Sequence, residues 1–332
     1  MGRVARAGAG PGPGRRGRAR MLACTAAVAV LVGPAAALSV MAAPAAAAGA
    51  HAAHHAAHHA AHHAAHHAAR RGSGPVDVLY AGSLLTLMQT SVGPAFHAAT
   101  GYSVTGIAEG STALAAEIKG GVRRADVFIS ASPSTNAKLE GASNGNWVSW
   151  YATFATSPLV LGYDRSSRFA AALRHKPWWR VVTQPGFLLG RTNPATDPKG
   201  VLAVKALDTT AKQHHDPALA ALAAKVTNVF PEQTLVGRLQ AGQLDAGFFY
   251  AVEAAAAKLP TVKLAGVPEH ASYTLTVLAR APHAAAADAF VKYLLGPKAK
   301  TLLAKQGLIE LGHARLSGRR AAVPVPLRRA VG

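Results

Sequence analysis

The chain has 332 residues, a formal net charge of +20 at pH 7 and a single cysteine, Cys24. Eight arginines lie in residues 1–71 and five in residues 315–329. The rest of the chain therefore contains 22 of the 35 lysines and arginines, together with all 15 acids. That modest excess suits an anionic ligand, whereas the chain lacks the dense stripe of Arg and aromatic residues typical of nucleic-acid binders.

Residues 1–49 have the pattern of a secretory signal peptide. Residues 1–20 carry six Arg and no acid, residues 21–41 are almost wholly apolar, and small residues follow. We therefore expect an exported protein, cleaved near residues 46–49. An uncleaved signal that tethers it to the membrane is one alternative, because the apolar span nearly suffices to cross a bilayer. Lipid attachment at Cys24 is another, although the apolar run lies after the cysteine.

Residues 50–74 form a His/Ala-rich, low-complexity linker. Its imidazoles recur every three or four residues, which on a helix would stack them on one face, and neutral imidazole is a common ligand of zinc, nickel or copper. A flexible linker and a transition-metal site both remain open as interpretations. The candidate metal ligands are His51, His54, His55, His58 and His59.

Strand and helix patterns alternate after the linker. Apolar runs predict strands at 76–80, 102–108 and 125–130, and helices at 84–100, at 112–120 and from about 134. This alternation predicts an α/β fold in which helices flank a mostly parallel sheet, with the ligand beyond the carboxyl ends of the strands. Ser83 and Ser111 fall there, each at a helix start, where backbone N–H groups and the helix dipole favour an anion.

The C-terminal part of the sequence predicts two helices and a tail. Apolar spacing over residues 284–306 indicates helices that break at Gly296-Pro297. Residues 313–332 contain five Arg, two Pro and no acid, and we predict a basic, disordered, solvated tail.

Five segments resemble the periplasmic molybdate/tungstate-binding proteins of ABC importers, especially a subgroup first described from archaea. They occur in the family's order and span essentially all of residues 75–312. The segments are Leu79-Tyr80-Ala81-Gly82-Ser83-Leu84, Glu109-Gly110-Ser111, Ala125-Asp126-Val127-Phe128-Ile129-Ser130-Ala131, Gly190-Arg191-Thr192-Asn193-Pro194 with Asp197-Pro198-Lys199-Gly200, and Gly242-Gln243-Leu244-Asp245-Ala246-Gly247-Phe248-Phe249-Tyr250.

The resemblance implies a two-lobed type II periplasmic-binding-protein fold with the ligand in the cleft between the lobes. The chain would cross between lobes near 156–163 and return near 273–278. Lobe one would then comprise residues 75–156 and 271–312, and lobe two residues 157–270.

The resemblance also implies a set of ligand-binding residues. Ser83, Ser111 and Tyr250 match the family's hydroxyl donors, and backbone N–H groups would come from the loop at 196–200 and from Glu232 and Gln233. In the archaeal subgroup two carboxylates can approach the metal, one in the Asp-Pro loop and one just before the tyrosine. Asp197 occupies the first position, but Phe249 occupies the second. We therefore expect tetrahedral binding, with Asp197 acting mainly as a helix cap.

Two other charged residues lie in or near the matched motifs. Glu253, one helical turn beyond Tyr250, is a weaker substitute for the missing carboxylate. Arg191 is predicted either to form a salt bridge within lobe two or to line the cleft.

The implied function is the capture of molybdate or tungstate outside the cytoplasm by a monomer that delivers it to an ABC importer's permease and ATPase, with no cofactor. Alternatives on the same fold are binding of sulfate, thiosulfate, phosphate or ferric ion, and a transition-metal buffer built on the His repeat is a further alternative. An enzyme is disfavoured, because the positions flanking Ser83 lack the glycines of a nucleophile elbow and no Lys-containing phosphate loop occurs.

Overall fold

The computed structural model describes residues 72–332. The predicted signal peptide and the candidate metal ligands His51, His54, His55, His58 and His59 lie outside the described residues, so both stay predictions. Among the described helices, none combines the length and apolar character needed to cross a bilayer.

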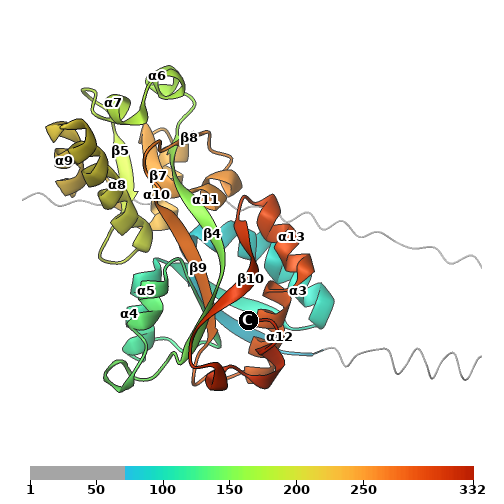
Figure 1. The fold of residues 1–332 in the computed structure, drawn as a ribbon. Helices are drawn as coiled ribbons and strands as arrows, with labels where there is room; N and C mark the ends of the chain where they lie inside the picture. The colour runs from blue at the N-terminus through green and yellow to red at the C-terminus, as the bar shows by residue number, and fades with distance from the viewer. Residues whose placement is uncertain (1–71) are drawn as a thin grey trace, which may run out of the picture. The chain divides into compact units, whose positions relative to one another are not determined.

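Ten strands in the described part of the chain form one hydrogen-bonded sheet (Figure 1). Their order is β2-β1-β3-β9-β4-β7-β5-β6, with β8 and β10 also paired to β4. The strands are β1 (Pro75–Ala81), β2 (Ser103–Glu109), β3 (Val127–Ser130), β4 (Trp150–Tyr163), β5 (Leu189–Thr192), β6 (Val229–Phe230), β7 (Ala246–Tyr250), β8 (Thr261–Lys263), β9 (His270–Val277) and β10 (Ile309–Gly318).

Two parallel groups, β1-β2-β3 and β5-β6-β7, are joined through antiparallel strands. The first half of β4 pairs with β9 and β10, and its second half pairs with β7 and β8. β4 therefore belongs to both parts of the sheet. The lobe boundaries at residues 156 and 271 stay predictions.

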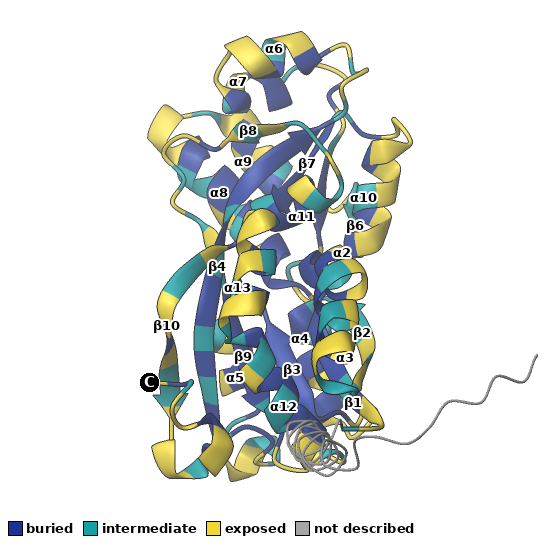
Figure 2. Cartoon of the chain, turned by 90° about the vertical axis from the view of Figure 1, so that its right-hand side faces the viewer, coloured by how far each residue is buried: buried dark blue, intermediate teal, exposed yellow. Residues whose placement is uncertain are grey.

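Helices cover both faces of the sheet, and the buried residues lie mainly along the strands (Figure 2). The helices are α2 (Leu85–Leu87), α3 (Gly93–Thr100), α4 (Ser111–Lys119), α5 (Pro133–Ala137), α6 (Ala170–His175), α7 (Trp178–Val182), α8 (Pro198–His214), α9 (Pro217–Ala224), α10 (Glu232–Gln240), α11 (Ala251–Ala256), α12 (Ala284–Leu294) and α13 (Pro297–Lys305). The predicted break between α12 and α13 at Gly296-Pro297 is confirmed.

The helix predicted at 84–100 is not continuous. A 3-10 turn, η1 (Gly82–Leu84), precedes α2, and a π-helical turn, η2 (Met88–Val92), separates α2 from α3. Pro94 explains part of this irregularity, because a proline lacks the N–H that would continue regular helical bonding to the preceding turn.

Alternating strand residues pack into separate apolar clusters on the two faces. Tyr80 and Tyr250 face the large central core, whereas Leu79 packs beneath α4 and Phe249 packs beneath α10. This is the period of two expected of strands covered on both faces.

The prediction of a disordered tail at 313–332 is wrong. β10 pairs antiparallel with β4 as far as Gly318, and two 3-10 turns follow, η4 (Arg320–Ala322) and η5 (Val325–Leu327). Val323, Leu327 and Val331 are at most 1% exposed. These three apolar residues, spaced four apart, bury enough surface to hold a segment whose arginines and prolines suggested disorder.

Candidate ligand-binding site

The ends of five strands carry the candidate site. In the β1–β2 pair, Ala81 lies opposite Glu109, so Gly82 and Gly110 leave the sheet at the same level. β5, β6 and β7 are likewise parallel neighbours, and each leads into a helix: α8, α10 and α11. The carboxyl ends of parallel strands are where the polar groups of α/β proteins gather.

The two parallel groups approach each other closely at these ends. Gln233 Nε2 donates to the carbonyl oxygen of Ala108 at 3.0 Å, and the N–H of Ala113 donates to the carbonyl of Thr196 at 3.0 Å. A Cβ atom on Gly82 would overlap the Glu232 carboxylate, and one on Gly110 would overlap the Thr196 carbonyl. Glycine is therefore needed at both strand ends for this approach.

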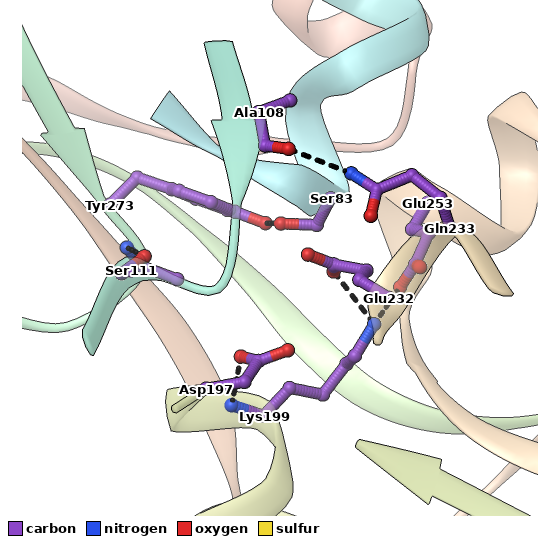
Figure 3. A network of polar contacts seen from close by, with 10 residues as sticks. Ser83, Ala108, Ser111, Asp197, Lys199, Glu232, Gln233, Glu253 and Tyr273 are labelled. Atoms are coloured by element: carbon purple, nitrogen blue, oxygen red, sulfur yellow. Dashed lines mark hydrogen bonds and ion pairs between the residues drawn. The ribbon is translucent and has the colours of Figure 1, made fainter. Parts of the chain in front are cut away.

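Hydroxyl groups gather at this junction (Figure 3). Ser83 Oγ lies 2.8 Å from the hydroxyl of Tyr273 on β9, and Ser111 Oγ accepts a hydrogen bond from the Ala131 N–H at 3.1 Å. Neither serine caps a helix with its side chain. The local capping interpretation therefore does not explain why hydroxyl residues stand here.

Tyr250 brings another hydroxyl to the same junction. Its ring packs edge to face against Tyr273, with centroids 6.2 Å apart. Its hydroxyl is buried and has no hydrogen-bond partner among the described residues. Burial, and then the negative charge of Asp197, raise the pKa of Tyr250 well above its ordinary value, so the hydroxyl remains a neutral donor.

A buried ion cluster lies beside the hydroxyls. Lys199 Nζ contacts Glu232 Oε1 at 2.7 Å and Glu253 Oε2 at 2.6 Å, and all three side chains are at most 7% exposed. The second oxygen of Glu253, Oε1, has no partner among the described residues. With both glutamates ionised the cluster would carry one net negative charge.

The pKa values of the cluster reflect this imbalance. Burial raises the pKa of Glu232 well above its ordinary value, and it raises that of Glu253, although Lys199 opposes the shift in both. For Lys199, burial alone would lower the pKa, but the attraction of Glu232 and Glu253 outweighs it and raises the pKa. The lysine therefore stays charged, and each carboxyl takes up a proton more readily than a glutamate in water does.

Asp197 acts as the helix cap that the sequence predicts. Its Oδ1 accepts the N–H of Lys199 at 2.8 Å, and α8 begins at Pro198. This bond occupies one of the N–H groups expected to face the ligand from the 196–200 loop. The side chains of Glu232 and Gln233 are also engaged, the first with Lys199 and the second with Ala108.

Two neighbouring cavities open at the junction. One, of about 400 Å³, is lined by Gly110, Thr192, Asn193, Asp197 and Glu232, among others. The other, of about 210 Å³, is lined by Ser83, Glu232, Gln233 and Glu253, among others. Glu232 and Gln233 border both cavities, so α10 supplies the wall between them.

Two further sequence expectations can be compared with the structure. Phe249 is fully buried on the opposite face of β7 from Tyr250, in the apolar cluster beneath α10, and its ring centroid lies 5.5 Å from Lys199 Nζ. Arg191 forms no salt bridge with a described residue, and it does not line the two cavities at the junction. Its guanidinium donates instead to the carbonyl oxygens of Thr192, Ala223 and Lys225.

Sequence reasoning missed two residues of this junction, Lys199 and Tyr273, and gave Glu253 little weight. One signal was available for Lys199: a cation in the first turn of a helix opposes the helix dipole and needs a specific partner. Tyr273 stands far from the hydroxyl motifs in the sequence, whereas Glu253 lies only three residues after Tyr250. The approach of both residues to the junction depends on how β9 and α11 pack.

The sequence of this chain matches a known protein family. Residues 76–309 match the family described as bacterial extracellular solute-binding protein. The chain belongs to this family of bacterial extracellular solute-binding proteins. Such proteins are exported transport components and not enzymes, which agrees with the prediction from sequence.

Individual relatives of this solute-binding protein carry more specific names. A putative ABC transporter molybdenum-binding protein of Haloferax volcanii is 31% identical over 209 residues, which cover 61% of this chain and 65% of the relative. A molybdate/tungstate-binding protein, WtpA, of Pyrococcus abyssi is 23% identical, covering 47% of this chain and 61% of the relative. The chain thus spans just under two thirds of each relative's length.

The fold agrees with a solved structure. The periplasmic molybdate-binding protein of Azotobacter vinelandii superposes with a TM-score of 0.59 at 20% identity, covering 70% of this chain and 98% of that one. The predicted type II periplasmic-binding fold is therefore confirmed.

Proposed function

We propose that this solute-binding protein captures molybdate or tungstate outside the cytoplasm and delivers it to an ABC importer made of a permease and an ATPase. The observation that carries the proposal is the buried, unpartnered hydroxyl of Tyr250 at a junction that also contains Ser83, Ser111 and Tyr273. The names of the Haloferax and Pyrococcus relatives support the choice of oxyanion.

Neutral donors suit a doubly charged oxyanion. Hydroxyl groups and helix N-termini supply local positive potential without a full counter-charge. Ser111 begins α4 and Glu232 begins α10, so two helices of nine residues each start at the junction. We therefore assign Ser83, Ser111, Tyr250 and the N-termini of α4 and α10 to the ligand.

We propose that the bound oxyanion keeps tetrahedral coordination. Each nearby carboxylate already has a partner: Asp197 accepts the Lys199 N–H, and Glu232 and Glu253 hold the Lys199 ammonium. A carboxylate that entered the metal's coordination sphere would have to give up or share this partner. X-ray absorption of the complex tests this point, and a six-coordinate spectrum would contradict it.

The proposal also covers the cofactor, export and the oligomeric state. The oxyanion is the only small ligand that we assign, with no separate cofactor. Residues 1–49 direct export, and the protein works as a monomer. Mass spectrometry of the exported protein would give the cleavage site, and light scattering would give the oligomeric state.

Isothermal titration calorimetry of the full chain with molybdate, tungstate, sulfate and phosphate tests the ligand. We use the full chain because residues 313–332 are part of the fold. The expected result is tight binding of molybdate and tungstate and weak binding of the other two. Tight sulfate binding without a response to molybdate would overturn the proposal and favour another oxyanion on this fold.

A further inference from the structure

The folded C-terminal segment presents a defined charged surface. β10 and the turns η4 and η5 hold it in place, and Leu327 and Val331 anchor it in the core with no exposed surface. We call its five exposed arginines the C-terminal basic surface: Arg315, Arg319, Arg320, Arg328 and Arg329. Figure 2 shows the C-terminus beside β10, among exposed segments.

These arginines lack counter-charges. Residues 311–332 contain no Asp or Glu, and none of the five guanidinium groups forms an ion pair with a described residue. Arg319 donates to Ser149 Oγ and Arg328 donates to the carbonyl oxygens of Val323 and Ala321. Exposed, unpaired cations on an ordered scaffold attract an anionic partner.

Exposed aliphatic side chains accompany the charges. Val325 is 71% exposed and lies in η5, between Arg320 and Arg328 in the sequence. Ile309, at the start of β10, is 57% exposed. A surface adapted only to a soluble polyanion gains nothing from exposed Val and Ile, whereas a lipid headgroup layer accommodates both cations and apolar side chains.

A small cavity lined in part by this segment also combines apolar and basic residues. Its volume is about 160 Å³, and it lies between α12, α13, β10 and the C-terminus. Phe154, Leu294 and Leu303 line it, and Lys300, His313 and Arg329 contribute basic groups. Glu310 is the one acidic residue of its lining. Apolar lining with mainly basic polar groups fits the boundary between headgroups and acyl chains.

We propose that the C-terminal basic surface binds the anionic headgroup layer of a lipid bilayer. The arginines would supply the electrostatic attraction and Val325 would contact the apolar boundary below the headgroups. Such a contact would keep an exported solute-binding protein near a membrane-embedded partner. It uses neither the hydroxyls nor the ion cluster of the candidate site, so ligand binding and membrane binding can be tested separately.

Hydrogen–deuterium exchange of the full chain provides a readout that is local to residues 309–332. The chain is mixed with vesicles of equal parts phosphatidylglycerol and phosphatidylcholine, or with vesicles of phosphatidylcholine alone. We expect slower exchange in peptides from 309–332 with the anionic vesicles only. Raising the salt to about 0.5 M should remove the protection, because it shortens the screening length to a few ångströms.

Matched variants test the role of charge. The triple change Arg315→Gln, Arg320→Gln and Arg329→Gln avoids the two arginines that make hydrogen bonds, and it should lower the affinity for anionic vesicles about tenfold or more. Replacement of the same three residues by Lys keeps the charge and should keep the binding. Changing Arg174, Lys176 and Lys225 to Gln removes the same charge from exposed positions elsewhere and should have no effect.

The apolar contribution is tested by Val325→Ser, which should also weaken vesicle binding. Equal exchange of residues 309–332 with and without anionic vesicles would overturn the proposal. Full protection in the Gln triple variant would overturn it as well. Protection by soluble heparin but not by anionic vesicles would identify the partner as an anionic polymer and reject the bilayer.

Discussion

The hydroxyl oxygens of Ser83 and Tyr273 lie 2.8 Å apart, although the two residues are separated by 190 positions in the sequence. Ser83 follows β1, and Tyr273 lies on β9, which also pairs with β4. The contact links the first hydroxyl motif to a strand that joins the two parallel groups. Both hydroxyls can exchange this mutual bond for bonds to a ligand.

Replacing Ser83 by Ala is expected to weaken molybdate binding by about 1–3 kcal/mol, because a hydrogen bond to a charged acceptor is lost. Calorimetric titration measures this change. Ser91→Ala, in the π-helical turn, is the matched control and should leave the affinity unchanged. Equal losses in both variants would point to a general effect on folding.

Tyr250→Phe should separate binding from stability. The hydroxyl has no hydrogen-bond partner in residues 72–332, so its removal should leave the melting temperature unchanged or slightly raised. Molybdate affinity should nevertheless fall by about 1–3 kcal/mol. Tyr163→Phe, at the far end of β4, is the control. An unaltered affinity in Tyr250→Phe would remove this residue from the site.

Gly82→Ala should prevent the close approach of β1 and α10, because the added methyl group would overlap the Glu232 carboxylate. We expect a loss of at least about tenfold in ligand affinity, equivalent to about 1.4 kcal/mol. Gly237→Ala is the matched control within α10, since its methyl group meets open space. That change should stabilise the helix by about 0.5–1 kcal/mol. A loss of ligand affinity in Gly237→Ala but not in Gly82→Ala would contradict the close packing of β1 against α10.

Lys199→Met should be the most destabilising change in the cluster, because it leaves two buried carboxyl groups without a counter-charge. The expected cost is about 3–5 kcal/mol in the free energy of unfolding, measured by urea denaturation at neutral pH. Glu253→Gln leaves Lys199 paired with Glu232, so its effect should be about 1 kcal/mol or less. Similar costs for the two variants would mean that the cluster's charge balance is unimportant.

The stability of the protein should depend on pH through Glu232 and Glu253. Both have a pKa raised above the ordinary value of 4.5, so between that value and the folded-state pKa the native state holds more protons than the unfolded state. Their contribution to the free energy of unfolding is therefore fully present below about pH 4.5 and is lost as the pH rises through the folded-state pKa values. Glu232→Gln should flatten this decrease, and Glu310→Gln, outside the cluster, should not.

The same linkage predicts the pH dependence of ligand binding. A dianion beside ionised carboxylates is repelled, so molybdate should bind more tightly as the pH falls from neutral and the two glutamates take up protons. Titrations in buffers with different ionisation enthalpies measure that proton uptake. The absence of proton uptake would show that the ligand binds away from the cluster.

Local sequence patterns predicted the main elements that position the site. The apolar runs identified β1, β2 and β3, and Asp197 with Pro198 marked the start of α8. These features depend on strand period and helix capping, which act over a few residues. The same local reasoning failed for residues 313–332, because the burial of Val323, Leu327 and Val331 depends on distant elements.

Local sequence pattern indicated the α/β alternation and placed Ser83 and Ser111 at helix starts that follow strands, whereas Asp197 and Tyr250 were named through the family resemblance. Only the tertiary structure decided which groups share the junction with them. Tyr273 reaches Ser83 because β9 pairs with β4, and Lys199 meets Glu232 and Glu253 because α8, α10 and α11 begin at neighbouring strand ends. Such contacts depend on tertiary packing, because the partners of a charged or hydroxyl group are its neighbours in space and have no fixed separation in the sequence.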